Sequence, residues 1–287
     1  MTAPMRLWRA MLYVPANVRR FVEKAPSANA DAVVLDLEDS VPADRKAEAR
    51  AGLAEAIAIA GSAGADVLVR VNRPLDLAVP DIVATAAGGA SGILLTKVLG
   101  PDHVRLAAEL LAAHERRPMT IIAMIETARA VQQVEAIAAA DPRVAGLLVG
   151  AEDLALDCGA EADDELIVMA KRRTLLAAAA TGVLPFGTLG TVADYRDAEH
   201  VRRVAMAARR SGFVGATCIH PSLVPVLRAA FSPTDAEVDR ARRQLAAAAE
   251  AAKEGRGSFT VDGLMVDEPI LIRARRLLAS MGDAAHG

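Results

Sequence analysis

Residues 120–150 contain the pattern that decides the fold. The apolar run Thr-Ile-Ile-Ala-Met-Ile at 120–125 is followed by an alanine-rich stretch at 128–139 and by a second apolar run, Ala-Gly-Leu-Leu-Val-Gly, at 145–150. Short runs without alternating polar residues are typical of strands buried on both faces. The stretch between them opens beside Thr127, a residue that often begins helices. This order predicts a βαβ unit in a parallel sheet.

The same alternation extends over most of the chain. Eight apolar runs are predicted to be strands: Ala10–Val14, Ala32–Leu37, Val67–Val71, Ile93–Val98, Thr120–Ile125, Ala145–Gly150, Leu184–Leu189 and Ala216–His220. Amphipathic stretches between them are predicted to be helices, among them Arg45–Ala60, Asp102–His114, Ala128–Ala139, Glu165–Thr181 and Ala198–Ser211. Eight strands interleaved with helices predict an α/β fold of the (β/α)8 type, a TIM barrel. Pro185 and Gly187 weaken the seventh strand.

The sequence after the eighth strand predicts a C-terminal helical extension. Asp235–Glu254 has the pattern of a long helix, Gly257–Pro269 that of an irregular or hairpin segment, and Ile270–Met281 that of a last helix. We therefore expect a barrel over residues 1–231 and an extension or lid over 232–287. The extension is too short for an ordinary independent domain, so we expect it to pack on the barrel or on a neighbouring subunit.

Composition excludes several classes of protein. The 33 basic and 36 acidic residues give a net charge of −3, and aromatic residues make up 3% of the chain, so nucleic-acid binding is not expected. The most apolar stretch, 53–69, contains Glu55 and Asp66, which argues against a membrane span. Two cysteines in unrelated contexts suit a reducing compartment, and we expect a cytoplasmic protein.

Six of the eight predicted strands end in or near an ionisable residue. In barrels of this type the reactive groups lie at the carboxyl ends of the strands. Glu126 and Asp153 directly follow neighbouring strands and should share one rim. Two carboxylates with open positions for water and substrate oxygens are typical of Mg²⁺ sites. The alternative, that both acids only stabilise helix N-termini, stays open on spacing alone.

Arg70 lies in a strand whose other residues are mainly apolar, so its guanidinium needs an anionic partner. It could grip a substrate carboxylate through two N–H groups, or form a structural salt bridge to Asp36 or Glu38. His220 could act as a general base, but a structural, hydrogen-bonded histidine is the favoured interpretation.

Several motifs occur in order along nearly the whole chain: Leu-Tyr-Val-Pro-Ala-Asn at 12–17, Asp-Leu-Glu-Asp-Ser-Val-Pro at 36–42, Val-Arg-Val-Asn at 69–72, Ile-Glu-Thr at 125–127, Gly-Ala-Glu-Asp-Leu at 150–154, Gly-Phe-Val-Gly at 212–215 and Ile-His-Pro at 219–221. Together they resemble the citrate lyase β-subunit-like branch of the HpcH/HpaI aldolase superfamily, which includes malyl-CoA and citramalyl-CoA lyases. The resemblance implies a Mg²⁺-binding barrel that cleaves or forms a carbon–carbon bond between an acyl-thioester enolate and a 2-oxo acid.

The resemblance also implies roles for single residues. Glu126 and Asp153 would bind the metal, with Glu126 also touching substrate, and Arg70 would bind the 2-oxo acid. Glu38 and Asp39 would orient metal-bound water. The segment at 262–267 is similar to one that reaches a neighbouring subunit's site, so Asp267 would be an acid/base group there, in a homotrimer or a dimer of trimers. A further expectation is that Arg9 contacts the phosphates of the thioester carrier; the alternative is a solvated charge.

The chain also departs from this family. The family commonly has an Ile-Asp pair at the end of strand seven, where this chain reads Pro-Phe-Gly-Thr at 185–188. The expected substrate is a 3-hydroxy-dicarboxyl-CoA thioester such as malyl-, citramalyl- or citryl-CoA. A malyl-CoA thioesterase or a synthase on the same site is the near alternative. A citrate-lyase-type subunit that binds an acyl-carrier partner, and a barrel without catalysis, are alternatives of other classes.

Overall fold

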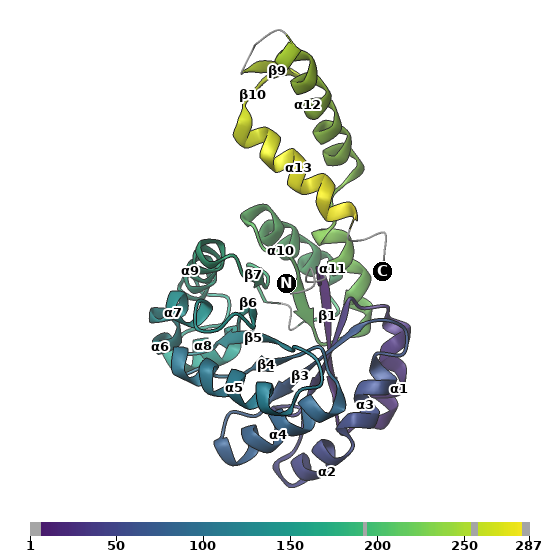
Figure 1. Ribbon diagram of the computed structural model, residues 1–287, viewed down its shortest axis with the longest axis vertical. Helices are drawn as coiled ribbons and strands as arrows, with labels where there is room; N and C mark the ends of the chain where they lie inside the picture. Colours follow the sequence, from purple (N-terminus) through teal and green to yellow (C-terminus); the bar gives the residue numbers. More distant parts are fainter. Residues whose placement is uncertain (1–6, 192–193, 254–257, 283–287) are drawn as a thin grey trace. The chain divides into compact units, whose positions relative to one another are not determined.

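Parallel strands surrounded by helices form the main unit of the protein. The computed structural model describes residues 7–191, 194–253 and 258–282 (Figure 1). One sheet has eight strands in the order β7-β6-β5-β4-β3-β2-β1-β8. These strands are β1 Ala10–Pro15, β2 Ala32–Asp36, β3 Asp66–Val71, β4 Gly92–Leu95, β5 Thr120–Ile125, β6 Val144–Val149, β7 Leu184–Phe186 and β8 Ala216–Cys218. The predicted TIM barrel is confirmed.

Helices follow the strands around the outside of the sheet (Figure 1). They are α1 Arg19–Lys24, α2 Lys46–Ala51, α3 Leu53–Ala60, α4 Leu75–Gly88, α5 Pro101–His114, α6 Ala128–Gln132, α7 Val134–Ala138, α8 Ala151–Cys158, α9 Glu165–Thr181, α10 Ala198–Ser211 and α11 Val224–Phe231, with three short 3₁₀ turns at Ala25–Ala28, Ala43–Arg45 and Pro221–Leu223. The helix predicted over 45–60 is interrupted at Gly52, and the one over 128–139 at Gln133.

The barrel closes through few backbone contacts. Strand β8 pairs with β1, but it meets β7 only at the bridge between Phe186 and Gly215. The Gly187 N–H donates to the Gly215 carbonyl at 2.8 Å, and the Val214 N–H donates to Pro185 at 3.1 Å. Pro185 has no N–H, and Gly187 has a φ of 141°. Strand β7 therefore ends at Phe186, three residues earlier than its sequence predicts.

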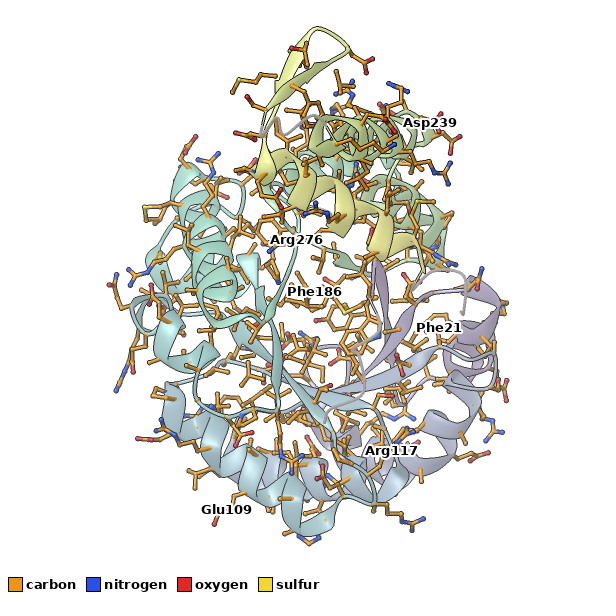
Figure 2. The ribbon with its side chains drawn as sticks, turned by 45° about the horizontal axis from the view of Figure 1, so that its top comes forward. Phe21, Glu109, Arg117, Phe186, Asp239 and Arg276 are labelled. Atoms are coloured by element: carbon orange, nitrogen blue, oxygen red, sulfur yellow. The ribbon has the colours of Figure 1, made fainter. Side chains whose placement is uncertain are left out.

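Side chains alternate between the barrel interior and the helix layer. One buried cluster gathers interior residues from seven strands and includes Val34, Leu68, Met124 and Phe186; Figure 2 shows Phe186 inside the ring of strands. A larger cluster lies between the strands and the helices. Since strand residues two apart share a face, the interior rows of β2, β3 and β5 continue to Asp36, Arg70 and Glu126. The alternation thus turns three ionisable groups towards the barrel mouth.

Contacts group the described residues into two compact units, Trp8–Phe231 and a second that contains Leu7 and the described residues from Ser232 onward. In the second unit, α12 (Asp235–Lys253) and α13 (Glu268–Gly282) accompany a hairpin of β9 (Phe259–Val261) and β10 (Leu264–Val266). Asp262 and Gly263 both have positive φ, as tight hairpin turns require. Among the described residues, no helix combines the length and apolarity that crossing a membrane would need.

The closure of the barrel gives a stability prediction. A Cβ atom at Gly215 would lie 1.9 Å from the backbone oxygen of Trp8, which no side-chain movement can relieve. We expect Gly215→Ala to lower the free energy of unfolding by roughly 3 kcal/mol, at the upper end of overpacking costs, as measured by urea denaturation. Gly52→Ala is the matched control, because its Cβ would meet no atom closer than 3.8 Å. Equal stabilities of the two variants would contradict this account of the closure.

Candidate active site at the barrel mouth

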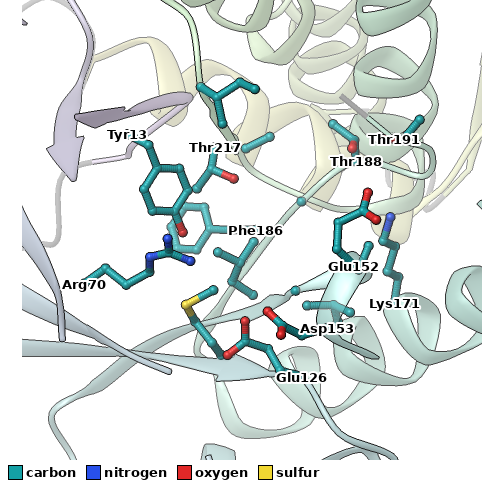
Figure 3. Close-up of a pocket in the computed structure, with 18 of the residues that line it drawn as sticks. Tyr13, Arg70, Glu126, Glu152, Asp153, Lys171, Phe186, Thr188, Thr191 and Thr217 are labelled. Atoms are coloured by element: carbon teal, nitrogen blue, oxygen red, sulfur yellow. The ribbon is translucent and has the colours of Figure 1, made fainter. Parts of the chain in front are cut away.

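A cavity of about 340 Å³ opens at the carboxyl ends of the strands. Its lining includes Tyr13 from β1, Arg70 from β3, Glu126 after β5 and Asp153 in the first turn of α8. Figure 3 shows the carboxylates of Glu126 and Asp153 facing each other, with Arg70 on another wall. The structure therefore brings together the residues that the sequence places on one rim.

Arg70 is held by the acidic segment after β2. Its Nε and Nη2 donate to the two oxygens of Asp36, each at 2.7 Å, and its Nη1 lies 3.0 Å from Glu38 and 3.2 Å from Asp39. The ring of Tyr13 lies 5.0 Å from the guanidinium carbon. Burial would raise the pKa of Asp36, but the hydrogen bonds and charge of Arg70 outweigh it and lower that pKa. Arg70 thus forms a salt bridge to Asp36, one of the two interpretations that the sequence left open. This salt bridge orients the guanidinium group at the edge of the cavity.

Glu126 is buried at the bottom of the mouth, with 2% of its surface exposed. Its Oε2 accepts a hydrogen bond from the backbone N–H of Lys97 at 2.5 Å. A Cβ atom at residue 150 would lie 2.4 Å from Oε1, so only glycine there leaves room for this carboxylate. Burial, together with the charges of Glu38 and Asp153, raises the pKa of Glu126 from 4.5 to about 7. The carboxylate of Asp153 is thus held close to the buried carboxylate of Glu126.

Neither acid serves as the cap of its following helix. Thr127 caps α6 by accepting from the Ala130 N–H at 3.1 Å. Helix α8 begins after Gly150 without a side-chain cap, and Asp153 directs its carboxylate to Lys97 and Glu126. The alternative in which the two acids only stabilise helix N-termini does not describe their contacts.

Lys97 is a member of the site whose contacts no local sequence pattern predicts. Its Nζ donates to Glu38 Oε1 at 2.6 Å and lies 3.4 Å from Asp153 Oδ1 and 3.8 Å from Asp39 Oδ1. Its φ is 45°, which is uncommon for a residue other than glycine and concentrates at functional sites. The neighbouring carboxylates, Glu38 first, raise the pKa of Lys97 despite its partial burial. The ammonium group is therefore charged and lies among the acids.

The cluster holds more negative than positive charge. Five carboxylates (Asp36, Glu38, Asp39, Glu126 and Asp153) surround two cations (Arg70 and Lys97), so with all groups ionised the net charge is 2 − 5 = −3. Glu38 Oε2 is buried and accepts no hydrogen bond, although Arg70 Nη1 lies 3.0 Å from it as an ion-pair partner. Within the described residues, no three His, Cys, Asp or Glu side chains are placed to hold a metal ion together. Two carboxylates plus water and substrate oxygens still suffice for Mg²⁺, so Glu126 and Asp153 fit a divalent cation.

The opposite wall of the cavity carries a third cation, and this one is buried. Lys171 of α9 is 4% exposed, and its Nζ donates to the Gly190 carbonyl at 3.3 Å. Figure 3 shows the carboxylate of Glu152 beside this ammonium group. Burial lowers the pKa of Lys171 to about 8, against the opposing charge of Glu152. Sequence reasoning did not single out Lys171, because it lies within a helix rather than at a strand end.

Three other sequence candidates are not among the residues that line this cavity. Arg9 precedes the amino end of β1 and is 8% exposed, so it is not a solvated charge and does not join the groups at the carboxyl ends. Asp267 lies in the second unit at the start of α13, where its carbonyl and carboxylate accept from the first N–H groups of that helix. His220 Nδ1 contacts Ser222 Oγ at 2.7 Å, and its ring stacks on Tyr195, as expected of a structural histidine.

The raised pKa of Glu126 predicts a pH-dependent stability of the metal-free protein. A carboxyl whose pKa is higher in the folded chain contributes stability that is complete below about 4.5 and is lost as pH rises through about 7. Glu126→Gln keeps the acceptor for Lys97 and removes this titration. In EDTA, the free energy of unfolding of the wild type should fall relative to that of Glu126→Gln between pH 5 and pH 8. Parallel curves from urea denaturation would contradict the assignment.

The chain matches the family model described as HpcH/HpaI aldolase/citrate lyase over residues 9–221. It is 36% identical to a citrate lyase subunit beta-like protein of Deinococcus radiodurans, over 97% of this chain and 99% of the relative. A (3S)-malyl-CoA thioesterase of Cereibacter sphaeroides is 36% identical over 95% and 94%. The mitochondrial citramalyl-CoA lyase of Mus musculus is 30% identical over 94% and 85%.

Solved structures show the same relationship. The protein CitE of Mycobacterium tuberculosis, in complex with magnesium, acetoacetate and coenzyme A, superposes with a TM-score of 0.77 at 32% identity, covering 95% of this chain and 97% of the other. The citrate lyase beta subunit of that organism, complexed with oxaloacetate and magnesium, gives 0.66 at 30% identity over 79% and 98%. The shared fold, the matched motifs and these identities together establish that this chain is an enzyme of the HpcH/HpaI aldolase/citrate lyase family.

Proposed function

We propose that the enzyme is a Mg²⁺-dependent carbon–carbon lyase that cleaves, or forms, a 3-hydroxy-dicarboxyl-CoA thioester. The products of cleavage are an acyl-CoA and a 2-oxo acid. The observation that carries this proposal is the pairing of Glu126 with Asp153 at a mouth that also presents Arg70. Related proteins that carry the names citramalyl-CoA lyase and citrate lyase subunit beta-like support the reaction class.

Glu126 and Asp153 would hold the metal ion, in keeping with the magnesium in the structures of the Mycobacterium tuberculosis relatives. When bound, Mg²⁺ supplies Lewis-acid stabilisation of the oxygens on the emerging 2-oxo acid. The excess of negative charge in the cluster favours binding of a dication. Glu38 and Asp39 lie on the same side of the cavity and would orient water near the site.

Arg70 would bind the carboxylate of the 2-oxo acid. Asp36 engages Nε and Nη2, while the more exposed Asp39 contacts Nη1 at 3.2 Å. Nη1 also lies 3.0 Å from the buried Glu38; the side chain of Asp39 is 59% exposed, so its contact is the weaker of the two and can give way to a substrate carboxylate. Asp36 in turn holds the guanidinium plane towards the mouth, which limits the freedom that substrate binding must remove.

The cleavage has two stages: the bond between C2 and C3 breaks, and the resulting enolate is protonated. A base removes the proton of the 3-hydroxyl group, the C–O bond becomes a carbonyl, and the bond between C2 and C3 breaks. Its electron pair passes to C2 and forms the thioester enolate, which an acid then protonates at C2. Asp267 is the proposed acid/base group at the enolate, contributed by a neighbouring subunit. Under this proposal residues 1–231 form the barrel, and residues 232–287 pack on a barrel as a lid within a homo-oligomer.

A thioesterase is the second candidate, because a (3S)-malyl-CoA thioesterase is as similar to this chain as the beta-like relative is. A subunit that acts only on an acyl-carrier thioester is the third, suggested by the citrate lyase subunit names. The three differ in their products and in the thioester they accept. One assay therefore separates them.

We predict that purified protein with Mg²⁺ converts at least one of malyl-, citramalyl- and citryl-CoA to an acyl-CoA and glyoxylate, pyruvate or oxaloacetate, as followed by mass spectrometry. Asp153→Asn removes one metal ligand and should lower kcat/KM by about 100-fold or more, in line with ligand and second-shell losses at metal sites. EDTA should abolish turnover. Free CoA without a 2-oxo acid would identify a thioesterase, and no turnover of any CoA thioester would favour the carrier-dependent subunit.

The role of Asp267 predicts complementation between impaired variants. Asp267→Ala and Asp153→Asn should each have little activity alone, because each lacks one part of every site. Co-expressed, they should form mixed oligomers in which some sites combine an intact Asp153 with an intact Asp267. Partial recovery of activity in the mixed oligomer, isolated with two affinity tags, is the expected result. A mixed oligomer without activity would place Asp267 outside the neighbouring site.

A further inference from the structure

Lys97 connects both proposed metal ligands through two different parts of one residue. Its backbone N–H donates to Glu126 Oε2 at 2.5 Å, while its Nζ lies 3.4 Å from Asp153 Oδ1. The same Nζ donates to Glu38 Oε1 at 2.6 Å. Residue 97 makes both contacts from a left-handed backbone conformation, with a φ of 45°.

The two side-chain contacts of Lys97 differ in strength. The contact with Glu38 is short, and the side chain of Glu38 is 7% exposed. The contact with Asp153 is 0.8 Å longer (3.4 − 2.6), and the side chain of Asp153 is 30% exposed. Lys97 therefore holds Asp153 less tightly than it holds Glu38. A cation that approaches from the cavity can displace the ammonium group from Asp153, while Glu38 keeps that group in place.

A metal ion on Glu126 and Asp153 would bring two further positive charges close to this ammonium group. Like charges at such separations repel strongly where solvent is partly excluded. The Lys97 ammonium and the metal ion thus compete for the charge of Asp153. Without the metal, the same ammonium group offsets the repulsion between Asp153 and Glu126.

We propose that Lys97 is a positioning residue that holds Asp153 in the metal-free enzyme and releases this carboxylate when the metal binds. This inference rests on the proposed function, because it assumes a divalent cation on Glu126 and Asp153. Lys97 then sets the affinity of the site for the metal. It stabilises the acidic cluster when no metal is bound, and its contact with Asp153 lowers the metal affinity because metal binding must break that contact.

The test is a calorimetric titration of the full-length protein with Mg²⁺ at pH 8, comparing wild type, Lys97→Met and Lys46→Met. Lys46 is the matched control: its Nζ donates to the carbonyls of Leu37 and Glu38 and to Asn72, and none of its contacts is with Asp153. Lys97→Met should bind Mg²⁺ about three- to fivefold more tightly, the upper range expected from one partly exposed ion pair, whereas Lys46→Met should stay within about twofold of wild type.

Thermal unfolding gives a second readout that does not depend on turnover. In EDTA, Lys97→Met should unfold at a lower temperature than wild type, and the rise in Tm on adding Mg²⁺ should be larger. If Lys97→Met does not fold, Lys97→Gln replaces it, because the amide can still donate to Glu38 without carrying charge. Lys97→Arg, which keeps the charge, should bind Mg²⁺ with an affinity nearer to that of wild type.

Equal or weaker Mg²⁺ binding by Lys97→Met than by wild type would overturn the proposal, since the ammonium group would then support the metal rather than compete with it. A similar gain in Lys46→Met would also overturn it, because the effect would be one of general charge. If the wild type itself binds no Mg²⁺, the proposed function fails first, and the inference about Lys97 fails with it. Tight binding by the wild type without a gain in Lys97→Met removes the inference about Lys97 alone.

Discussion

Arg70 and Asp36 face each other across neighbouring strands, and the rest of the site is built around this pair. The register of β2 and β3 places Asp36 beside Arg70, so both side chains point into the barrel. A shift of one residue would turn one of them into the apolar layer beneath the helices, where an unpaired charge is costly. Sheet register and the ion pair therefore support each other. The pair leaves Glu38 and Asp39 on the side of the mouth where Glu126 and Asp153 lie.

Excess negative charge is the electrostatic consequence of this arrangement. The chain accepts a buried Glu126 beside Asp153 and Glu38, a grouping that raises the pKa of Glu126 and works against folding at neutral pH. Lys97 offsets part of that repulsion from within the chain. A dication bound to the two acids would offset more of it, so the feature that strains the metal-free protein is also the one that favours a metal. The same carboxylates thus lower the stability of the metal-free protein and favour metal binding, a conflict that is common at active sites.

The opposite side of the mouth differs in both strand pairing and charge. Strand β7 is short and meets β8 through a single bridge, because proline and a glycine of positive φ interrupt its pairing. The wall there is formed by Phe186 and Thr188, with Lys171 reaching in from α9. This is where the sequence departs from the resemblance on which its function was predicted. The mouth therefore has two unlike walls, one rich in charged pairs and one assembled from a weakly paired strand and a helix.

The sequence by itself determined the barrel, the approximate positions of its strands and the placement of Arg70, Glu126 and Asp153 at one rim. Those features follow from local patterns: apolar runs of strand length, the two-residue alternation of side chains, and polar residues directly after each strand. The sequence offered Asp36 or Glu38 as partners of Arg70, and only the tertiary structure decided which contacts form. Lys97 and Glu38 are 59 positions apart and Arg70 and Asp36 are 34 apart. Such pairings depend on register between strands, on a left-handed backbone at Lys97 and on space beside Gly150, and no single segment of sequence encodes contacts that arise only when separate segments meet.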